Sequence, residues 1–275
     1  MTEKKSFIAV LTEAVDWFMR NGFTNQSELD RWIGRLRFAA THMMQSSAVT
    51  DRKVSQALTQ GYEARIKRDR EIALKEGVSR FTVEKIKPKL RSELNRRIRA
   101  SADLIKLNRD EAIAKTLRRF EGWTSSIPPG GTSGDVTRRD KKREIYRDLK
   151  QMPFVERRVL IDQGHKLASN ISSILAVQNN AIAAKWHSRW RVPGYDYRED
   201  HRERDEHVYL IRGSWAQNKG LVKPSLAGYS DEITQPAEEP FCMCNFQYLY
   251  FLPELPADML TEAGRKTIAI QKQAA

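Results

Sequence analysis

The sequence predicts an α+β fold, in which a mainly helical N-terminal body with long basic helices is joined to a small antiparallel β unit near the C-terminus. Up to about residue 183, apolar residues recur at spacings of three and four, as on one face of a helix. Beyond Lys185, short aromatic and β-branched runs alternate with proline and glycine, which is typical of strands and turns. Helical and strand patterns that occupy separate parts of a chain indicate the α+β class.

Four helices are expected in the N-terminal part. The first carries its apolar face from Phe7 to Met19 and ends at Asn21-Gly22. Ser27-Glu-Leu-Asp30 reads as a cap that opens the second helix. The third runs from Asp51 to about Glu76, and the fourth from Phe81 to about Trp123 with a break or kink at Pro88 near its start.

Residues 124–134 form the clearest interruption of the chain, because two prolines and three glycines among eleven residues cannot continue a helix. We predict a linker at 124–136, or a loop that wraps a neighbouring element. This divides the chain into a helical basic region at 1–123 and an α+β domain at 137–275. In the second part we expect a helix from Thr137 to Lys150 and, after Met152-Pro153, a longer helix over 154–183.

Three strands are predicted in the C-terminal third: Trp186–Trp190, His207–Gly213 and Phe246–Leu252. The tryptophans of this region supply area to what must be a small core. Trp17 and Trp32 lie on helical apolar faces and are expected in the core of the helical body.

The positive charge is concentrated in the middle of the chain. The 275 residues carry a net charge of +13, and residues 51–100 alone hold 15 basic against 7 acidic side chains. This indicates either an electrostatic footprint for a polyanion or a solvated helix face. Contact with DNA would be non-specific, because the sequence carries no helix-turn-helix, zinc-finger or RNP signature. The candidates for DNA contact are Arg65, Lys67, Arg68, Arg96, Arg97 and Arg99.

No apolar run approaches the roughly 20 residues that a membrane-spanning helix needs, so no membrane segment is predicted. The apolar stretch at the start of the sequence is too short and too soon acidic for a signal peptide.

The two cysteines, Cys242 and Cys244, cannot form a disulfide framework, and a reducing compartment is expected. On a strand, both side chains point to the same face. With His201 or His207 they would supply sulfur and nitrogen ligands for a structural Zn²⁺ in a β unit with little core of its own. The alternatives are a pair of small buried residues, or a reversible disulfide whose short ring would be strained.

Several separate segments, taken in order, carry a family resemblance. An Asp-Gln element on a helix is followed by a tryptophan on a strand, an Arg-x-x-His-x-x-x-Asp element and a Pro-x-Cys-x-Cys element. This order resembles the C-terminal domain of the phage Mu F-like minor head proteins, also called phage head morphogenesis proteins, over residues 154–256. The matching residues are Asp162, Gln163, Trp186, Arg198, His201, Asp205, Cys242 and Cys244.

Three positions depart from the family pattern. Ile161 stands where the family usually has arginine, Glu206 stands in place of the customary glycine after Asp205, and Met243 stands in place of an arginine between the cysteines. A glycine after Asp205 would accept a positive φ freely, as a tight turn requires.

The resemblance implies a minor structural protein of a tailed-phage head, with no catalytic residues and no enzymatic activity. It implies a place inside the virion near the portal, with the host cytoplasm as the site of assembly. Expected partners are the portal or major capsid protein and double-stranded DNA, in head assembly and in DNA packaging or ejection. The resemblance also favours an ion network of Arg198, Asp200, Arg204 and Asp205 that positions His201, over a solvated loop of alternating charge.

Two other functions remain open from the sequence. One is a zinc-dependent, toxin-like hydrolase that uses His201, Asp205, Cys242 and Cys244. The other is a helical scaffold whose basic stretch binds acidic protein surfaces.

Overall fold

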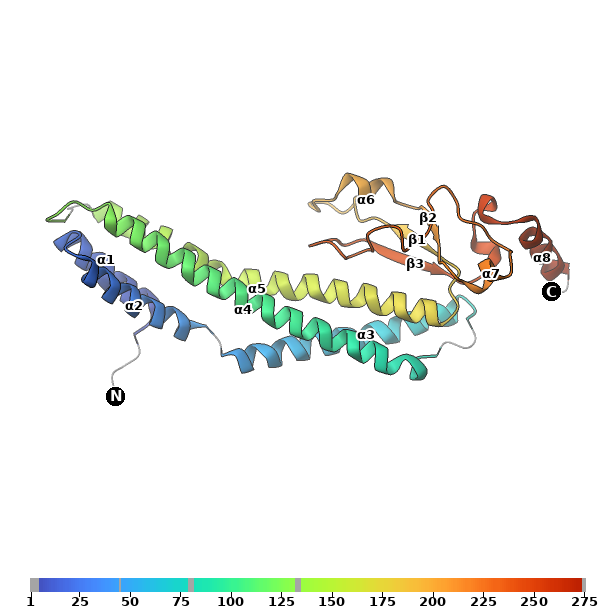
Figure 1. Ribbon diagram of the computed structural model, residues 1–275, viewed down its shortest axis with the longest axis horizontal. Coiled ribbons are helices and arrows are strands. Elements are labelled where there is room, and N and C mark those ends of the chain that lie inside the picture. The colour runs from blue at the N-terminus through green and yellow to red at the C-terminus, as the bar shows by residue number, and fades with distance from the viewer. Residues whose placement is uncertain (1–4, 45, 79–81, 132–134, 274–275) are drawn as a thin grey trace. The chain divides into compact units, whose positions relative to one another are not determined.

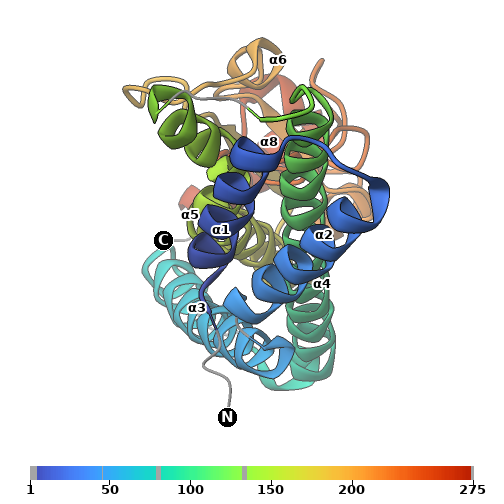
Figure 2. The same cartoon turned by 90° about the vertical axis from the view of Figure 1, so that its left-hand side faces the viewer.

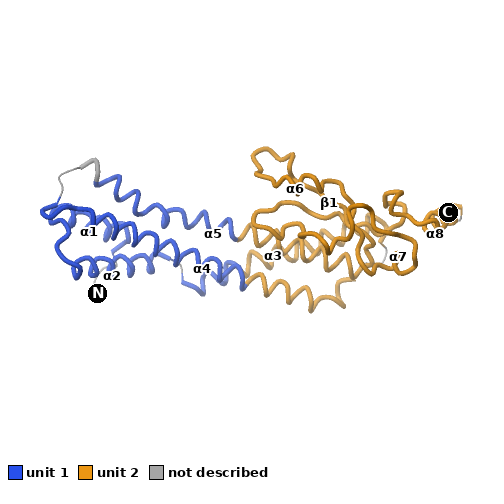
Figure 3. The backbone as a smooth tube through the Cα atoms, turned by 45° about the horizontal axis from the view of Figure 1, so that its top comes forward, with its two compact units in different colours: residues 1–54, 99–159 blue, residues 55–98, 160–275 orange. Residues whose placement is uncertain are grey.

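The computed structural model describes residues 5–44, 46–78, 82–131 and 135–273, and it confirms the α+β class (Figure 1). The long helices are α1 (Phe7–Asn21), α2 (Gln26–Met43), α3 (Ser47–Lys75), α4 (Lys87–Ser125) and α5 (Asp135–Gln178). They precede a three-stranded sheet. The chain forms two compact units, which Figure 3 distinguishes by colour: unit 1 comprises residues 1–54 and 99–159, and unit 2 comprises residues 55–98 and 160–275.

Unit 1 is helical, with α1 and α2 lying side by side (Figure 2). Side-chain oxygens cap both helices: Ser6 accepts the N–H of Ala9, and Asn25, rather than the predicted Ser27, accepts the N–H of Glu28. Such caps satisfy backbone donors that have no partner within the helix. Aromatic and aliphatic side chains of four helices form one core, which includes Phe7, Phe18, Trp32, Leu36, Phe120, Ile145 and Leu149.

The proline- and glycine-rich segment is a loop that wraps the end of α1, the second of the two predicted alternatives. Gly22 has φ +70°, and a Cβ there would lie 2.4 Å from the carbonyl oxygen of Pro128. A Cβ at Gly131 would lie 2.1 Å from the carbonyl oxygen of Met19. Only glycine permits this approach of two backbones. The loop therefore lies inside unit 1, and the units do not divide at the predicted 124–136 boundary; residues 132–134 of it lie outside the described part.

The predicted break at Pro153 is wrong, because α5 continues through it from Asp135 to Gln178. An interior proline removes one backbone hydrogen bond and crowds the preceding turn. Here Leu149 and Met152 are buried in the core of unit 1, while Pro153 faces solvent. Packing of Leu149 and Met152 before the proline, and of the partly buried Val155 after it, outweighs the single lost bond.

The fourth predicted helix corresponds to α4, and its residues Leu94, Ile105 and Leu117 form the expected buried stripe among exposed arginines. A 3-10 turn (Glu84–Ile86) precedes it, and Pro88 falls in its first turn, where no intrahelical donor is needed. The predicted start at Phe81 lies outside the described residues. Among the helices that the structure describes, none combines the length and apolar character needed to cross a membrane.

Unit 2 contains the antiparallel sheet in the order β2-β1-β3. The strands are β1 (Ala183–His187), β2 (Val208–Leu210) and β3 (Asn245–Leu249). The last two overlap the predicted strands, whereas β1 begins three residues before the predicted start at Trp186, because α5 ends at Gln178 and not at residue 183. One face of the sheet carries Ala184, Trp186 and Phe246 and packs on the two cysteines. The other face packs on a second small core with residues from α7 (Trp215–Asn218) and the 3-10 helices Leu252–Glu254 and Ala257–Met259. The C-terminal helix α8 (Glu262–Gln273) was not predicted.

Candidate metal centre

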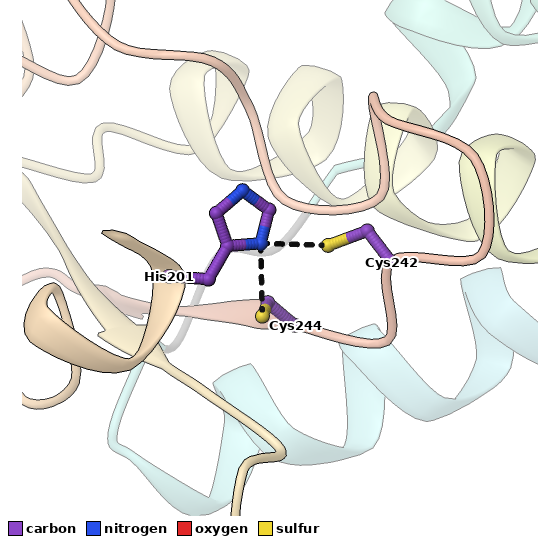
Figure 4. A group of neighbouring side chains, drawn as sticks. All are labelled: His201, Cys242 and Cys244. Atoms are coloured by element: carbon purple, nitrogen blue, oxygen red, sulfur yellow. Dashed lines mark hydrogen bonds between the residues drawn. The ribbon is translucent and has the colours of Figure 1, made fainter. Parts of the chain in front are cut away.

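His201, Cys242 and Cys244 form a buried cluster in unit 2 (Figure 4). His201 lies on the short helix α6 (Glu199–Glu203), and the cysteines lie in the segment that leads into β3. The imidazole Nδ1 is 3.4 Å from the Sγ of Cys242 and 3.6 Å from the Sγ of Cys244. The exposed fractions of the three residues are 1%, 2% and 5%. One nitrogen and two sulfurs therefore converge on one point that is shielded from solvent.

The sheet supplies the wall of this cluster. The ring of Trp186 on β1 lies edge-on to the His201 imidazole, with centroids 5.2 Å apart, and packs in the same way against Phe246 on β3. Aromatic contacts of this geometry hold a ring in one orientation. These contacts hold the His201 ring so that its Nδ1 faces the two sulfurs.

A backbone loop carrying the cysteines is anchored to α5 by the Asp-Gln element. The N–H of Phe241 donates to Asp162 Oδ1 at 2.6 Å, joining residues 79 positions apart. The other carboxylate oxygen of Asp162 pairs with Lys166 at 3.1 Å. Phe241 has φ +60°, so this contact stabilises a backbone conformation that a bulky residue seldom adopts.

The same loop is also held by residues that directly precede α6. The Tyr195 hydroxyl donates to the carbonyl of Phe241 at 3.3 Å and accepts the N–H of Met243 at 3.0 Å. Arg198 donates to the carbonyl of Pro240 at 3.1 Å. The spacing of the two sulfurs is thus set by hydrogen bonds around the loop. Tyr195 was missed in the sequence, where nothing but its proximity to Arg198 marks it.

Gln163 is buried beside Asp162 and faces α4. Its amide oxygen accepts a hydrogen bond from Arg97 at 3.3 Å. Arg97 also pairs with Glu93 at 2.9 Å, and Glu93 accepts a hydrogen bond from Asn170 at 2.8 Å. Burial raises the pKa of the Glu93 carboxyl, but the hydrogen bonds from Asn170, Arg96 and Arg97 outweigh it, so the pKa is lowered overall. This network holds α4 against α5.

The second ring nitrogen of His201 faces carboxylates. Nε2 is 3.8 Å from Asp200 Oδ2 and 4.0 Å from Glu239 Oε2, and it is buried without a hydrogen-bond partner in the described residues. Arg204 pairs with Asp200 at 2.9 Å, and Arg198 pairs with Glu239. Of the predicted ion network, the Asp200–Arg204 pair forms beside the ring, at its rim, since the Asp200 side chain is 52% exposed, whereas Arg198 pairs with Glu239 instead.

Asp205 lies apart from this network and holds the turn after β1. It accepts the N–H of Ser188 at 2.8 Å and the indole N–H of Trp190 at 3.0 Å. Burial raises the pKa of its carboxyl, but these two hydrogen bonds outweigh that effect, so the pKa lies below its usual value. Glu206 adopts φ +68°, a conformation that glycine accepts more freely, and pairs with Lys185.

The two thiols differ in acidity. A hydrogen bond from the Cys244 thiol, together with the backbone N–H groups of Ala237 and Cys244, lowers the pKa of Cys242 to about 5. The same thiol–thiolate bond raises the pKa of Cys244. Cys242 is thus the sulfur that the surroundings favour as a thiolate, the form that binds metal.

The cluster supplies three of the four ligands of a tetrahedral metal ion. With bonds of about 2.3 Å to sulfur and 2.0 Å to nitrogen, two ligands at the tetrahedral angle lie about 3.5 Å apart. The two observed nitrogen–sulfur distances, 3.4 and 3.6 Å, lie on either side of that value. Thiolate and imidazole are the ligands that Zn²⁺ prefers in structural sites. The carboxylates beside Nε2 are placed where a metal-bound histidine places its second N–H.

The other predicted site residues lie elsewhere. His207 is exposed and takes no part in the cluster. Arg65 is held by Ser172 and Asp69, and Arg97 by Glu93 and Gln163, so both serve contacts within unit 2. Arg96 pairs with Glu93 but stays 58% exposed. Lys67, Arg68 and Arg99 are exposed on α3 and α4, as contact with DNA requires.

Comparison with known proteins found no match: no family model, no curated protein and no solved structure resembles the chain significantly.

Proposed function

We propose that this chain is a minor structural protein of a tailed-phage head, located inside the virion near the portal. It would act in head assembly and in packaging or ejection of the genome, without catalysing a reaction. Unit 2 would dock on the portal or major capsid protein. The exposed cations of α3 and α4 would contact packaged DNA through its phosphates, without sequence preference.

The observation that carries this proposal is the hydrogen bond from the N–H of Phe241 to Asp162. It joins the Asp-Gln element to the Pro-x-Cys-x-Cys element, two of the separate segments on which the resemblance to phage head morphogenesis proteins rests. The arginine–histidine element completes the group, since Arg198 binds Pro240 and His201 meets both sulfurs. Segments that match a family in order and also meet in space support a shared domain.

Virion composition tests the proposal. Mass spectrometry of purified particles of a phage that encodes the chain is expected to detect it in fewer copies than the major capsid protein. Deletion of its gene is expected to yield defective heads or particles that fail to deliver DNA. A chain that is absent from virions, and whose deletion leaves particle yield and infectivity unchanged, would contradict the proposal.

We also propose that His201, Cys242 and Cys244 hold a structural Zn²⁺. The ion would cross-link α6 to the segment before β3, in a part of the protein whose cores are small. The deep burial of all three ligands supports a structural role. It also weighs against the zinc-dependent hydrolase, since a substrate needs an accessible ion, and Asp205 is occupied by Ser188 and Trp190.

Metal analysis separates this role from a metal-free thiol pair. The purified protein is expected to contain one equivalent of zinc, and a cobalt-loaded sample to show thiolate-to-cobalt absorption. Cys242→Ser and His201→Ala should each weaken zinc binding at least tenfold, whereas His207→Ala, which alters an exposed histidine outside the cluster, should not. Protein that takes up no zinc or cobalt, and whose unfolding temperature is unaffected by a chelator, would overturn the site.

A further inference from the structure

A groove lies between α3, α5 and β3 in unit 2, and its lining does not include His201. Its volume is about 420 Å³, within the range of sites that bind ligands or peptide side chains. Residues about one helical turn apart on α3, between Arg65 and Glu76, form one wall. A similar row of residues on α5, between His165 and Ala176, forms another. The third wall is the chain from Met243 to Tyr248, every residue of which lines the groove.

Consecutive residues of a strand line a groove only where the groove follows the edge of the sheet. β3 is an edge strand, since it pairs with β1 alone. The carbonyl of Leu249 accepts the N–H of Ile182, so Leu249 and, by alternation, Gln247 and Asn245 turn their backbone groups toward β1. The N–H and C=O groups of Phe246 and Tyr248 therefore point away from β1, toward the groove.

No partner for these four backbone groups is found among the described residues. A row of unpaired donors and acceptors along a strand is a template for another strand. Proteins that recognise extended peptides use such an edge, with side-chain pockets beside it. In this groove the edge and the pocket occur together.

Three further basic side chains line the groove and form no hydrogen bond or ion pair within the described part of the chain: Arg68, His165 and Arg189. A third arginine, Arg65, is already engaged, because its guanidinium binds Asp69 and Ser172. The remaining acidic side chain of the lining is Glu76. Arg68 and Arg189 together outnumber this one carboxylate, so the groove favours a negatively charged occupant.

We propose that this groove binds an acidic segment of a partner protein, in extended conformation, as a fourth strand on the edge of β3. The segment's backbone would pair with Phe246 and Tyr248. Its acidic side chains would meet Arg68 and Arg189, and the side chains pointing the other way would fill the cavity between the helices. This inference stands apart from the virion assignment, because it rests on the edge, the cavity and the unpaired cations alone.

A pool of fluorescent octapeptides, in which glutamate alternates with valine, isoleucine, leucine, phenylalanine or tyrosine, tests the proposal. Peptides retained by the full-length protein are measured by fluorescence anisotropy. We expect binding that falls at least tenfold in the double variant Arg68→Glu/Arg189→Glu. The matched control is Arg70→Glu combined with Lys75→Glu, which reverses two exposed charges of α3 outside the groove lining and should change affinity little.

Methylated peptides separate strand pairing from simple charge attraction. N-methylation of alternate residues removes the donors that would pair with β3 but keeps the charge, and it should abolish binding. The proposal is overturned if no member of the pool binds, if N-methylation has no effect, or if both double variants weaken binding equally. It is also overturned if a 20-base-pair duplex, used as competitor, binds in the groove with the same dependence on Arg68 and Arg189, because the groove is then a nucleic-acid site.

Discussion

His201 offers a single ring nitrogen, Nδ1, to two sulfurs at nearly equal distances. A neutral imidazole nitrogen either carries one proton or has one lone pair, so it cannot form full hydrogen bonds to both. A metal ion between the three atoms removes this conflict, since each ligand then donates its own electron pair. The geometry of this one residue is the main physical reason to expect zinc.

Glu206 is a second residue whose conformation is unusual, with φ +68°. We compare Glu206→Gly with Glu206→Ala, both of which remove the pairing with Lys185. Alanine keeps a Cβ in the left-handed region, whereas glycine does not, so the glycine variant should be more stable by about 1 kcal/mol. Urea unfolding measures the difference. An alanine variant as stable as the glycine variant would show that the turn is not strained.

Asp205 gives the protein a defined sensitivity to acid. Its pKa is lowered in the folded protein, so its stabilising contribution is complete above its ordinary value of 3.8 and is lost as the pH falls through the lower folded value. Asp205→Asn should therefore reduce stability at neutral pH and reduce the further loss of stability below about pH 4. Thermal unfolding of both proteins, measured from about pH 2.5 to about pH 7 so that the Asp205 carboxyl changes charge, checks this. Parallel curves for the two proteins would contradict it.

At the scale of elements, α5 connects much of the molecule. Its first part packs in the core of unit 1. Its second part supplies Asp162 to the cysteine loop, Gln163 to the network with α4, and one wall of the groove. Pro153 lies within this helix with its side chain exposed. The sequence pattern alone could not anticipate the continuous helix, because a local rule about proline was outweighed by packing on both sides.

Pro153→Ala tests how much the proline costs. Alanine restores the backbone donor toward the carbonyl of Leu149 and removes the ring clash, so the free energy of unfolding should rise by about 1–3 kcal/mol. The measurement is chemical denaturation followed by circular dichroism. A loss of stability would instead show that the helix needs a bend at this position.

At the scale of the whole molecule, the net charge of +13 is not spread over equivalent side chains. Arg65 and Arg97 each form an ion pair within their own helix and a hydrogen bond to α5, with Ser172 and Gln163 respectively. Lys67 and Arg99 face solvent. Composition cannot separate these two kinds of cation, because both count equally in the sequence. Only the exposed ones can release counterions from DNA.

Binding to duplex DNA should follow this division. Lys67→Ala and Arg99→Ala should each weaken binding and lower the salt dependence by about one unit of slope, without changing stability. Arg97→Ala should lower the free energy of unfolding by about 1–3 kcal/mol, with little effect on the slope. Filter binding between about 50 and 200 mM salt, with thermal unfolding in parallel, tests both. Affinity that is independent of salt would contradict contact with DNA.

The sequence alone determined the class of the fold and three strands that overlap the observed ones. It also determined the helical stripe through Leu94, Ile105 and Leu117. From residue chemistry it singled out His201, Cys242 and Cys244 as possible metal ligands. These follow from periodicity and residue chemistry, which are local properties of the chain. Tertiary structure decided that α5 runs through Pro153 and that Asp162 and Tyr195 shape the cysteine loop. It also decided that Arg65 and Arg97 make contacts within the protein, and that the free edge of β3 faces a basic groove. Each of these depends on contacts between residues distant in sequence, and no local pattern records them.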